Sequence, residues 1–308
     1  MGLIGVGKMG LAMAANMRRA GIQLVVYDIS RKACEAAERL GCLVASSPRA
    51  VAEQTPTVLS VLPNDKILWD STLSAEGIAA GLKSGGIHVS CSTVAPETSR
   101  KLAEKHKDFG HIFVGAPVFA RPDGIAAKNG TWCLSGPSAG VEVAKKILQT
   151  TCSGIYEFGE DPGAANVVKL CGNFMIASAI ESIGESLALA ENNGLDREQV
   201  MKMFRETIFN CLIYKGYGNR VASRKHFQDV EHPGFALELG LKDIALVLET
   251  ASKSSPQVPM PLASLLANRL TASKNLGRAD QDWSAIGLHI SEEAGVDVSE
   301  IVKNPRPE

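Results

Sequence analysis

The sequence predicts two domains: an α/β domain with a doubly wound parallel sheet, followed by an all-helical domain. The chain has 308 residues, which is long for one core and ordinary for two. Short apolar runs alternate with helical patterns through the first half, the order typical of a parallel sheet covered by helices on both faces. From residue 162 onward the pattern is helical almost throughout. We therefore predict a dinucleotide-binding domain over residues 1–161 and a helical domain over residues 162–308.

The elements of the first half follow from apolar runs and the glycines between them. Strands are expected at residues 3–6, 24–28, 57–62 and 86–90, and helices at residues 9–20 and 31–40, each helix ending before a glycine. Three more strand patterns follow, at residues 112–114, 131–134 and 154–157, with a helix over residues 141–150. We expect these three strands to extend the same sheet.

The second half opens with a long apolar stretch, residues 164–193. A helix of that length, at ~1.5 Å per residue, is long enough to leave one domain and enter the next. Further helices are expected at residues 197–209, 237–252 and 261–276. Long apolar helices of this kind also favour self-association.

Composition and charge exclude several classes of protein. The net charge is −1, so no general attraction draws the chain to nucleic acid or to an anionic membrane. Seven cysteines without a C-x-x-C pair, and six histidines without ligand spacing, predict neither a disulfide framework nor a metal site. A strand pattern follows Met1 directly and no 18-residue apolar run is apparent. We expect a cytoplasmic protein with reduced thiols, no leader peptide and no membrane span.

A glycine loop, Gly5-x-Gly7-x-x-Gly10, lies between the first strand and the first helix. Gly5 permits a tight turn, Gly7 lets the backbone approach a phosphate, and Gly10 lets the helix pack on the strand. The helix N-terminus offers N–H groups to an anion. The loop, with Val6, Lys8 and Met9, is therefore predicted to hold the pyrophosphate of a nicotinamide cofactor.

Asp28 ends the second strand, near 20 residues after the loop. A carboxylate there accepts hydrogen bonds from the ribose hydroxyls and repels a 2′-phosphate, which favours NAD over NADP. Arg31 and Lys32 follow closely and leave NADP open, because either cation is able to hold that phosphate. The plainer interpretation of both is a solvated helix start.

Polar residues also follow the next two strands at the carboxyl edge, where open α/β sheets bind ligands. Leu62, Pro63 and Asn64 close the strand at residues 57–62, and Ser92 and Thr93 follow the strand at residues 86–90. We predict cofactor contacts for Leu62, Pro63, Asn64 and Thr93, and a substrate contact for Ser92. The alternative for Thr93, with Pro96, is simply the start of a helix.

Residues 2–14 resemble the opening of the β-hydroxyacid dehydrogenases, and the resemblance covers nearly the whole chain. Further motifs of that family occur in its order at residues 62–63, 92–93, 116–118, 163–173 and 241–243. The resemblance implies a Rossmann domain joined to a helical domain, as in 6-phosphogluconate dehydrogenase. It also implies an NAD(P)-dependent enzyme that interconverts a small β-hydroxyacid and its aldehyde or keto acid. A homodimer or homotetramer formed through the helical domain would follow.

Lys169 and Asn173 are four residues apart, which places both on one face of a helix. On its own, a lysine in this apolar stretch is a snorkelling surface residue or a buried functional ammonium. The resemblance makes Lys169 the catalytic lysine and Asn173 a substrate-binding partner. Such a lysine donates a proton to a carbonyl oxygen or accepts one when neutral, and partial burial lowers its pKa toward the useful range.

Lys242 lies in a stretch that resembles the family motif of the helical domain, so we predict that it reaches the nicotinamide side of the site. The alternative is a Lys–Asp pair on a helix surface. His226 and Phe227 are loop residues within reach of a substrate in principle, although no local pattern requires it.

The chain departs from the family after residues 116–118. The family has Ser-Gly-Gly there, which grips the substrate carboxylate, whereas this chain has Phe119, Ala120 and Arg121 before Pro122. Phe119 adds apolar surface and Arg121 offers a bidentate donor; the alternative for Arg121 is an exposed turn residue. The usual aspartate two residues before the Ser-Thr pair is Ser90, for which we have no functional interpretation.

Two alternatives to a β-hydroxyacid dehydrogenase remain open. An imine-reductase-like enzyme would act on an uncharged substrate, which Phe119 favours and Lys169 opposes. A non-catalytic, cofactor-bound interaction module would have no need of Lys169 and Asn173. A 6-phosphogluconate-type sugar-acid dehydrogenase fits less well because its chain is longer.

Overall fold

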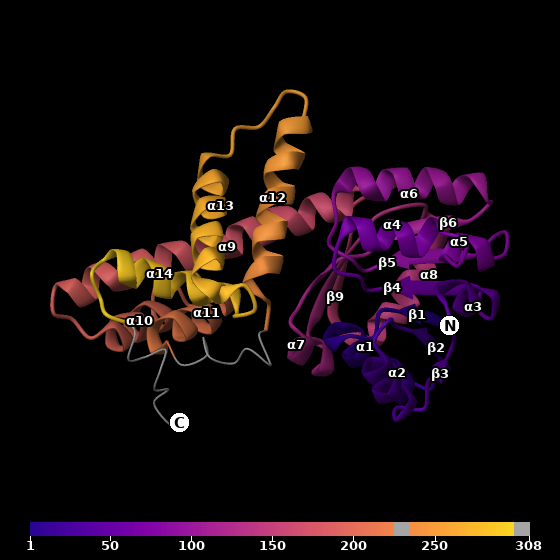
Figure 1. The fold of residues 1–308 in the computed structure, drawn as a ribbon, viewed down its shortest axis with the longest axis horizontal. Helices are drawn as coiled ribbons and strands as arrows, with labels where there is room; N and C mark the ends of the chain where they lie inside the picture. Colours follow the sequence, from indigo (N-terminus) through magenta and orange to yellow (C-terminus); the bar gives the residue numbers. More distant parts are fainter. Residues whose placement is uncertain (225–233, 299–308) are drawn as a thin grey trace. The chain divides into compact units, whose positions relative to one another are not determined.

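The computed structural model describes residues 1–224 and 234–298. The chain divides into two compact units, residues 1–169 and 170–308. The first unit holds a parallel sheet with helices and the second is helical, so the predicted fold class is confirmed (Figure 1). The division lies within one long helix, and the domain boundary between residues 161 and 162 stays a prediction.

The main sheet of the first unit has six parallel strands in the order β3-β2-β1-β4-β5-β6. The strand order reverses between β1 and β4, and open α/β sheets bind ligands at the carboxyl ends of the strands beside such a switch point. The strands are β1 (Gly2–Ile4), β2 (Val25–Tyr27), β3 (Leu43–Val44), β4 (Thr57–Ser60), β5 (Ile87–Ser90) and β6 (Ile112–Gly115).

Helices connect these strands. Gly21 and Gly41 follow the first two helices with φ of +82° and +81°, left-handed conformations that glycine adopts without strain and that end a helix. The helices of the first unit are α1 (Lys8–Arg19), α2 (Arg31–Glu38), α3 (Pro48–Glu53), α4 (Asp65–Leu73), α5 (Ile78–Gly81), α6 (Pro96–Asp108), α7 (Pro122–Ala126) and α8 (Ser138–Leu148).

A second, three-stranded sheet follows β6. It consists of β7 (Val118–Phe119), β8 (Gly130–Leu134) and β9 (Cys152–Glu157), with β7 and β8 antiparallel and β8 and β9 parallel. The expectation that all three late strands extend the main sheet was therefore wrong, and only β6 joins it. Gly115 and Ser135 exchange two backbone hydrogen bonds of 2.9 Å as an isolated antiparallel bridge, so the chain reverses there instead of adding a parallel strand.

The core of the first unit forms because its central strands β1, β4 and β5 are buried on both faces. Leu3, Val26, Leu59 and Val89 come from four neighbouring strands and are fully buried. Met13 and Met17, four residues apart on α1, are also fully buried and belong to the same cluster as all four of these residues. This rigid core fixes the edge at which the predicted cofactor residues lie.

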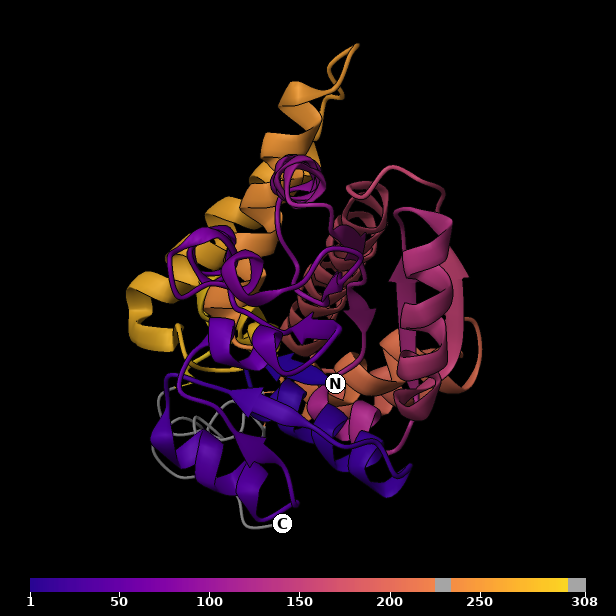
Figure 2. The same cartoon turned by 90° about the vertical axis from the view of Figure 1, so that its right-hand side faces the viewer.

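The long predicted helix is α9 (Ala164–Asn192), which begins in the first unit. The other helices of the second unit are α10 (Arg197–Glu206), α11 (Leu212–Ser223), α12 (Leu237–Lys253), α13 (Pro261–Ser273) and α14 (Ile286–Glu293). Figures 1 and 2 show α12 and α13 lying side by side as a helical hairpin. The sequence patterns did not predict α11 and α14.

By length and composition α9 qualifies as a candidate membrane span, although polar residues interrupt its apolar sequence. An 18-residue window in α9 has a mean hydropathy of 1.3, and 44% of that window is buried inside the structure. Core helices of soluble proteins have the same composition, so the finding is weak evidence for a membrane.

Candidate active site

The glycine loop has the backbone geometry that its spacing predicts. Gly5 has a φ of +85°, and a Cβ there would lie 2.2 Å from the carbonyl oxygen of Val61. A Cβ on Gly10 would lie 1.9 Å from the carbonyl oxygen of Gly5, closer than atoms can approach. A Cβ on Gly7 would meet no atom of the described chain within 4 Å. The loop is thus closed on its protein side and open beside Gly7.

The N-terminus of α1 is built to receive an anion. Gly7 is its N-cap residue, no side chain of the described residues caps it, and its first turn contains no acidic residue. The first backbone N–H groups of an α-helix have no intrahelical partner, and the positive end of the helix dipole adds to the field there. Lys8 is exposed and Met9 is half-buried in this first turn.

Asp28 is tied to the loop by backbone hydrogen bonds. Its two carboxylate oxygens accept from the N–H of Val6 and the N–H of Ser30, each at 2.8 Å. The N–H of Gly5 donates to the carbonyl of Tyr27 at 2.9 Å, so the loop and the end of β2 form one unit. Arg31 has a side chain 92% exposed, with its Nε 3.0 Å from Glu35 on the surface of α2.

The loops after β4 and β5 are joined by Ser92. Its Oγ, in a residue only 2% exposed, accepts a 2.9 Å hydrogen bond from the N–H of Leu62. Asn64 caps α4 by accepting from the N–H of Ile67 at 2.9 Å. The alternative for Thr93 does not describe α6, whose N-cap residue is Ala95 and whose first residue is Pro96.

Lys169 is buried rather than snorkelling, since only 8% of the residue is exposed. Its Nζ lies 4.2 Å from the centroid of the Phe119 ring, within the range of a cation–π interaction. Cys133, in β8, is 2% exposed, and burial raises the pKa of its thiol while the charge of Lys169 lowers it. The first unit therefore places the Lys169 side chain against an aromatic ring, and its charge acts on a thiol whose pKa burial raises.

The loop that departs from the family pattern lies beside this lysine. Phe119 ends β7, opposite Thr131 of β8. Ala120 is half-buried, and Arg121 is the N-cap residue of α7 with a side chain only 24% exposed. The alternative of an exposed turn arginine does not fit that burial. The Nε of Arg121 lies 3.9 Å from Asp123, too far for a hydrogen bond.

In the second unit the predicted residues gather around a carboxylate that the prediction did not include. Asn173, 3% exposed, donates from Nδ2 to Oδ2 of Asp243 at 2.5 Å. The Nζ of Lys242 lies 3.0 Å from Oδ1 of the same carboxylate, which is 1% exposed. Lys242 and Asp243 are therefore not a surface pair. The sequence signal for Asp243 was the presence of an aspartate within an apolar helical run. The predicted loop residues His226 and Phe227 lie outside the described residues.

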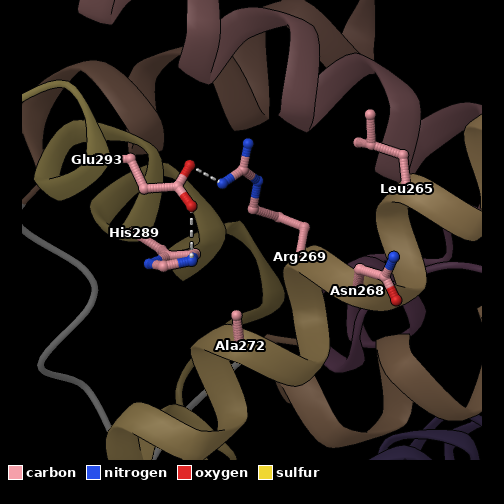
Figure 3. A pocket seen from close by; sticks show the side chains of 6 residues that line it. All are labelled: Leu265, Asn268, Arg269, Ala272, His289 and Glu293. Carbon is pink, nitrogen blue, oxygen red and sulfur yellow. Dashed lines mark hydrogen bonds and ion pairs between the residues drawn. The ribbon is translucent and has the colours of Figure 1, made fainter.

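A pocket of the second unit lies elsewhere, between α13 and α14, and none of the predicted site residues lines it (Figure 3). Its Arg269 is paired with Glu293 and with the buried Glu181, the latter at 2.8 Å, and His289 lies 3.4 Å from Glu293. The charge of Arg269 is thus balanced within the protein. The remaining lining residues are Leu265, Asn268 and Ala272.

Comparisons with known proteins agree with the two halves of the chain. The NAD binding domain of 6-phosphogluconate dehydrogenase matches residues 1–159, and the NAD-binding domain of NADP-dependent 3-hydroxyisobutyrate dehydrogenase matches residues 163–301. An uncharacterised oxidoreductase of Bacillus subtilis, YfjR, is 33% identical over 92% of this chain and 97% of its own. The 3-hydroxyisobutyrate dehydrogenase of Pseudomonas aeruginosa is 30% identical over 92% of this chain and 95% of its own.

Solved structures show the same fold. A 3-hydroxyisobutyrate dehydrogenase from Salmonella typhimurium has a TM-score of 0.81 at 24% identity, covering 94% of this chain and 98% of its own. An imine reductase from Myxococcus stipitatus has a TM-score of 0.62 at 18% identity, covering 94% of this chain and 98% of its own. The resemblance noted in the sequence is confirmed: the chain belongs to the β-hydroxyacid dehydrogenase family, and it is an NAD(P)-dependent oxidoreductase of the type that acts on CH–OH groups.

Proposed function

We propose that the protein interconverts a small β-hydroxyacid and its aldehyde or keto acid, with Lys169 as the general acid and base. The observation that carries this proposal is the burial of Lys169, only 8% exposed, one helical turn before Asn173 on α9. Burying an ammonium costs folding free energy, and ionisable groups held at such a cost are concentrated at functional sites. Proton transfer to a substrate oxygen is a function that fits this lysine. The related Pseudomonas aeruginosa enzyme, named for 3-hydroxyisobutyrate, supports this class of substrate.

The residues of the first unit fit a nicotinamide dinucleotide. Gly5, Val6, Gly7, Lys8, Met9 and Gly10 would hold the pyrophosphate, because the space beside Gly7 and the N-terminus of α1 are both suited to an anion. Each oxygen of Asp28 keeps a lone pair beyond its bond to the backbone and would accept from a ribose hydroxyl. We propose NAD as the preferred cofactor, with Arg31 on the surface of α2.

The remaining predicted residues would line the nicotinamide and the substrate. We assign cofactor contacts to Leu62, Pro63, Asn64, Thr93 and Lys242. We assign substrate contacts to Ser92, Phe119, Ala120 and Arg121, together with Lys169 and Asn173. Arg121, whose side chain is only 24% exposed, would take the place of the backbone cradle as the donor for an acid group, because a guanidinium has the geometry to donate two parallel hydrogen bonds to a carboxylate.

The chemistry at Lys169 is a proton transfer at its Nζ. The nicotinamide, when bound, gives a hydride to the carbonyl carbon or takes one from the alcohol carbon. In reduction the ammonium of Lys169 donates its proton to the substrate oxygen, and in oxidation the neutral amine accepts it. Asn173, oriented by Asp243, would position the same oxygen. General acid–base help of this kind contributes ~10²–10⁴-fold.

A second candidate is an imine-reductase-like activity on an uncharged substrate. The observation in its favour is Phe119, which presents an aromatic ring where the family has a polar cradle. A non-catalytic module is the candidate outside enzymes, and the burial of Lys169 and of the Asn173–Asp243 pair weighs against it.

A substrate panel tests these proposals together. Small hydroxyacids, semialdehydes and imines are each assayed with NAD(H) and with NADP(H). We expect turnover with a hydroxyacid or semialdehyde, and a higher kcat/KM with NAD(H). Turnover of imines alone would replace the proposal by the second candidate, and cofactor binding without turnover of any substrate would favour the module.

We also propose a cytoplasmic homodimer or homotetramer formed through residues 162–308. Apolar side chains exposed in the second unit support self-association, among them Leu212 at 84%, Met175 at 69% and Leu189 at 69%. Light scattering after size exclusion would give the number of subunits, and a monomer would refute this part.

A further inference from the structure

We infer that Phe119 stabilises the ammonium form of Lys169 and thereby extends carbonyl reduction by this enzyme to higher pH. The inference rests on the proposed function, since it assigns Lys169 as the proton donor. It makes Phe119 a positioning residue for the acid, in addition to any contact with substrate.

The contact is short and lies within the first unit. The Nζ of Lys169, on α9, lies 4.2 Å from the ring centroid of Phe119, on β7. Attraction between a cation and an aromatic face extends to about 6 Å, and it strengthens when water is excluded. Lys169 is 8% exposed, so little water competes with the ring.

The ring attracts only the charged form of the lysine. A neutral amine gains little from the negative face of the ring, whereas the ammonium gains the full interaction. Lys169 also acts electrostatically on Cys133. Cys133 of β8 has a thiol whose pKa is raised by burial, so it stays uncharged at neutral pH and adds no counter-charge. The ring is therefore a source of stabilisation that distinguishes the two forms.

Stabilisation of the Lys169 ammonium by the Phe119 ring has different effects on the reduction rate at high pH and at low pH. In reduction the hydride reaches the carbonyl carbon, the proton passes from Nζ to the oxygen, and the neutral amine regains a proton from water. At high pH the reaction slows because Lys169 is already neutral, and Phe119 moves this loss of activity to a higher pH. At low pH every molecule carries the ammonium, and the same stabilisation makes it a slightly weaker acid. Removal of the ring should thus lower activity at high pH without lowering the proton-transfer rate at low pH.

The family pattern shows why this feature distinguishes the present chain. The related sequences have serine at this position, as the resemblance implies, and a serine has no aromatic face. The substitution of phenylalanine therefore changes the electrostatics of the acid as well as the shape of the site. Its effect is expected on the pH profile even for a substrate that the altered loop binds well.

The test compares pH profiles of reduction for the wild type, Phe119→Leu and Phe119→Tyr, using the best semialdehyde or keto acid of the panel with NADH. Leucine keeps an apolar side chain without an aromatic face, and tyrosine keeps the face. For Phe119→Leu we expect the alkaline limb of kcat/KM to move about 0.4–1.5 pH units toward acid, as the size of a cation–π interaction implies. For Phe119→Tyr we expect a limb close to that of the wild type.

An unchanged alkaline limb in Phe119→Leu would overturn the inference, as would an equal shift in Phe119→Tyr. Thermal melting and NADH binding verify folding, and Phe119→Met takes the place of Phe119→Leu if that variant does not fold. Lys169→Met distinguishes a failure of the proposed function from a failure of the inference about Phe119. If it keeps its turnover, the proposed function fails; if it loses turnover while Phe119→Leu leaves the limb in place, only the present inference fails.

Discussion

The carboxylate of Asp28 accepts a 2.8 Å hydrogen bond from the backbone N–H of Val6, inside the glycine loop. This bond connects the end of β2 to the loop that follows β1, so the loop and the negative charge share one rigid position. A second amide, that of Ser30, holds the other oxygen at 2.8 Å. The charge is therefore fixed where the ribose of a dinucleotide is expected, which makes cofactor preference a direct consequence of this geometry.

Asp28→Ser should weaken the preference for NAD over NADP. The variant removes the charge that repels a 2′-phosphate, and its hydroxyl still accepts from a backbone amide. We expect the ratio of kcat/KM for NAD to that for NADP to fall by about tenfold or more, the effect of roughly 1.4 kcal/mol. Arg31→Ala is the control, since its side chain is exposed on α2. A larger change in Arg31→Ala than in Asp28→Ser would contradict our assignment of NAD.

Two alanine variants of the glycine loop should have different effects, one on cofactor binding and the other on stability. Gly7→Ala adds a methyl group that meets no described atom within 4 Å, so the fold is retained while the approach of the pyrophosphate is blocked. Gly10→Ala forces a Cβ to within 1.9 Å of the Gly5 carbonyl, so it should destabilise the first unit. Thermal melting and NADH titration separate the two effects. Normal NADH affinity in folded Gly7→Ala would refute the position of the pyrophosphate.

A chain of buried histidines crosses the first unit. Ser60 Oγ lies 2.8 Å from Nε2 of His88, whose Nδ1 lies 2.9 Å from Nε2 of His106. Nδ1 of His106 lies 3.3 Å from Nδ1 of His111, whose Nε2 donates to the Leu82 carbonyl at 2.8 Å. Because the carbonyl can only accept, one direction of donation along the chain satisfies every ring nitrogen when all three rings are neutral. An added proton would break one of these hydrogen bonds.

The histidine chain should make the protein sensitive to acid. Burial lowers the pKa of His106 to about 3, with repulsion by His111 as the second cause, and the pKa values of His88 and His111 are also lowered. Below about pH 6.5 the unfolded chain therefore binds more protons than the folded chain. The free energy of unfolding is unaffected by these histidines above that pH and falls as the pH drops toward 3. Each histidine held neutral costs about 1.4 kcal/mol per pH unit in this window.

Urea unfolding from pH 7 to pH 4 measures this effect, with His106→Leu for comparison. The variant should be less stable at pH 7, by about 1–3 kcal/mol for each ring nitrogen left unpaired. Its stability should nevertheless depend less on pH than that of the wild type, because one buried titrating group is gone. An equal or steeper dependence in the variant would contradict our account of the network.

Asp243→Ala should impair catalysis through Asn173. The variant leaves the Asn173 amide without its 2.5 Å acceptor and Lys242 without its carboxylate. We expect kcat to fall by about tenfold or more, because a misplaced polar group near a reacting atom costs rate. Glu249→Ala is the matched control on the same helix, where the carboxylate is exposed and paired with Lys253. Equal kcat values in the two variants would exclude a role for Asp243.

Much of the fold could be predicted from the sequence because local patterns determine it. The glycines after α1 and α2 and the apolar runs of β1, β4 and β5 are strong local signals, and each gave an element near its observed position. The second sheet could not be predicted, because pairing of β8 with β7 and β9 depends on the reversal at Gly115, a tertiary event. The strand β3 is only two residues long, Leu43 and Val44, which is too short an apolar run to indicate a strand.

The site was predictable in its residue types more than in its contacts. The spacing of Lys169 and Asn173 gave one helical face, but only the structure shows that Lys169 is buried against Phe119. Asp243 was missed because an aspartate beside a lysine has the pattern of an ordinary surface pair. Its place among the buried residues of α12, beside Ile244 and Val247, was the available signal, but the neighbouring lysine favoured the surface interpretation.

The most direct test of the central claim is the turnover of Lys169→Met, measured alongside its affinity for NADH. Methionine has a similar length and no proton to give. Lys146→Met is the matched control, since Lys146 is exposed on α8. We predict that kcat/KM falls by ~10²–10⁴-fold in Lys169→Met and stays near the wild-type value in the control, with NADH binding retained in both. Retained turnover in a folded Lys169→Met variant would contradict the assignment of Lys169 as the acid and base.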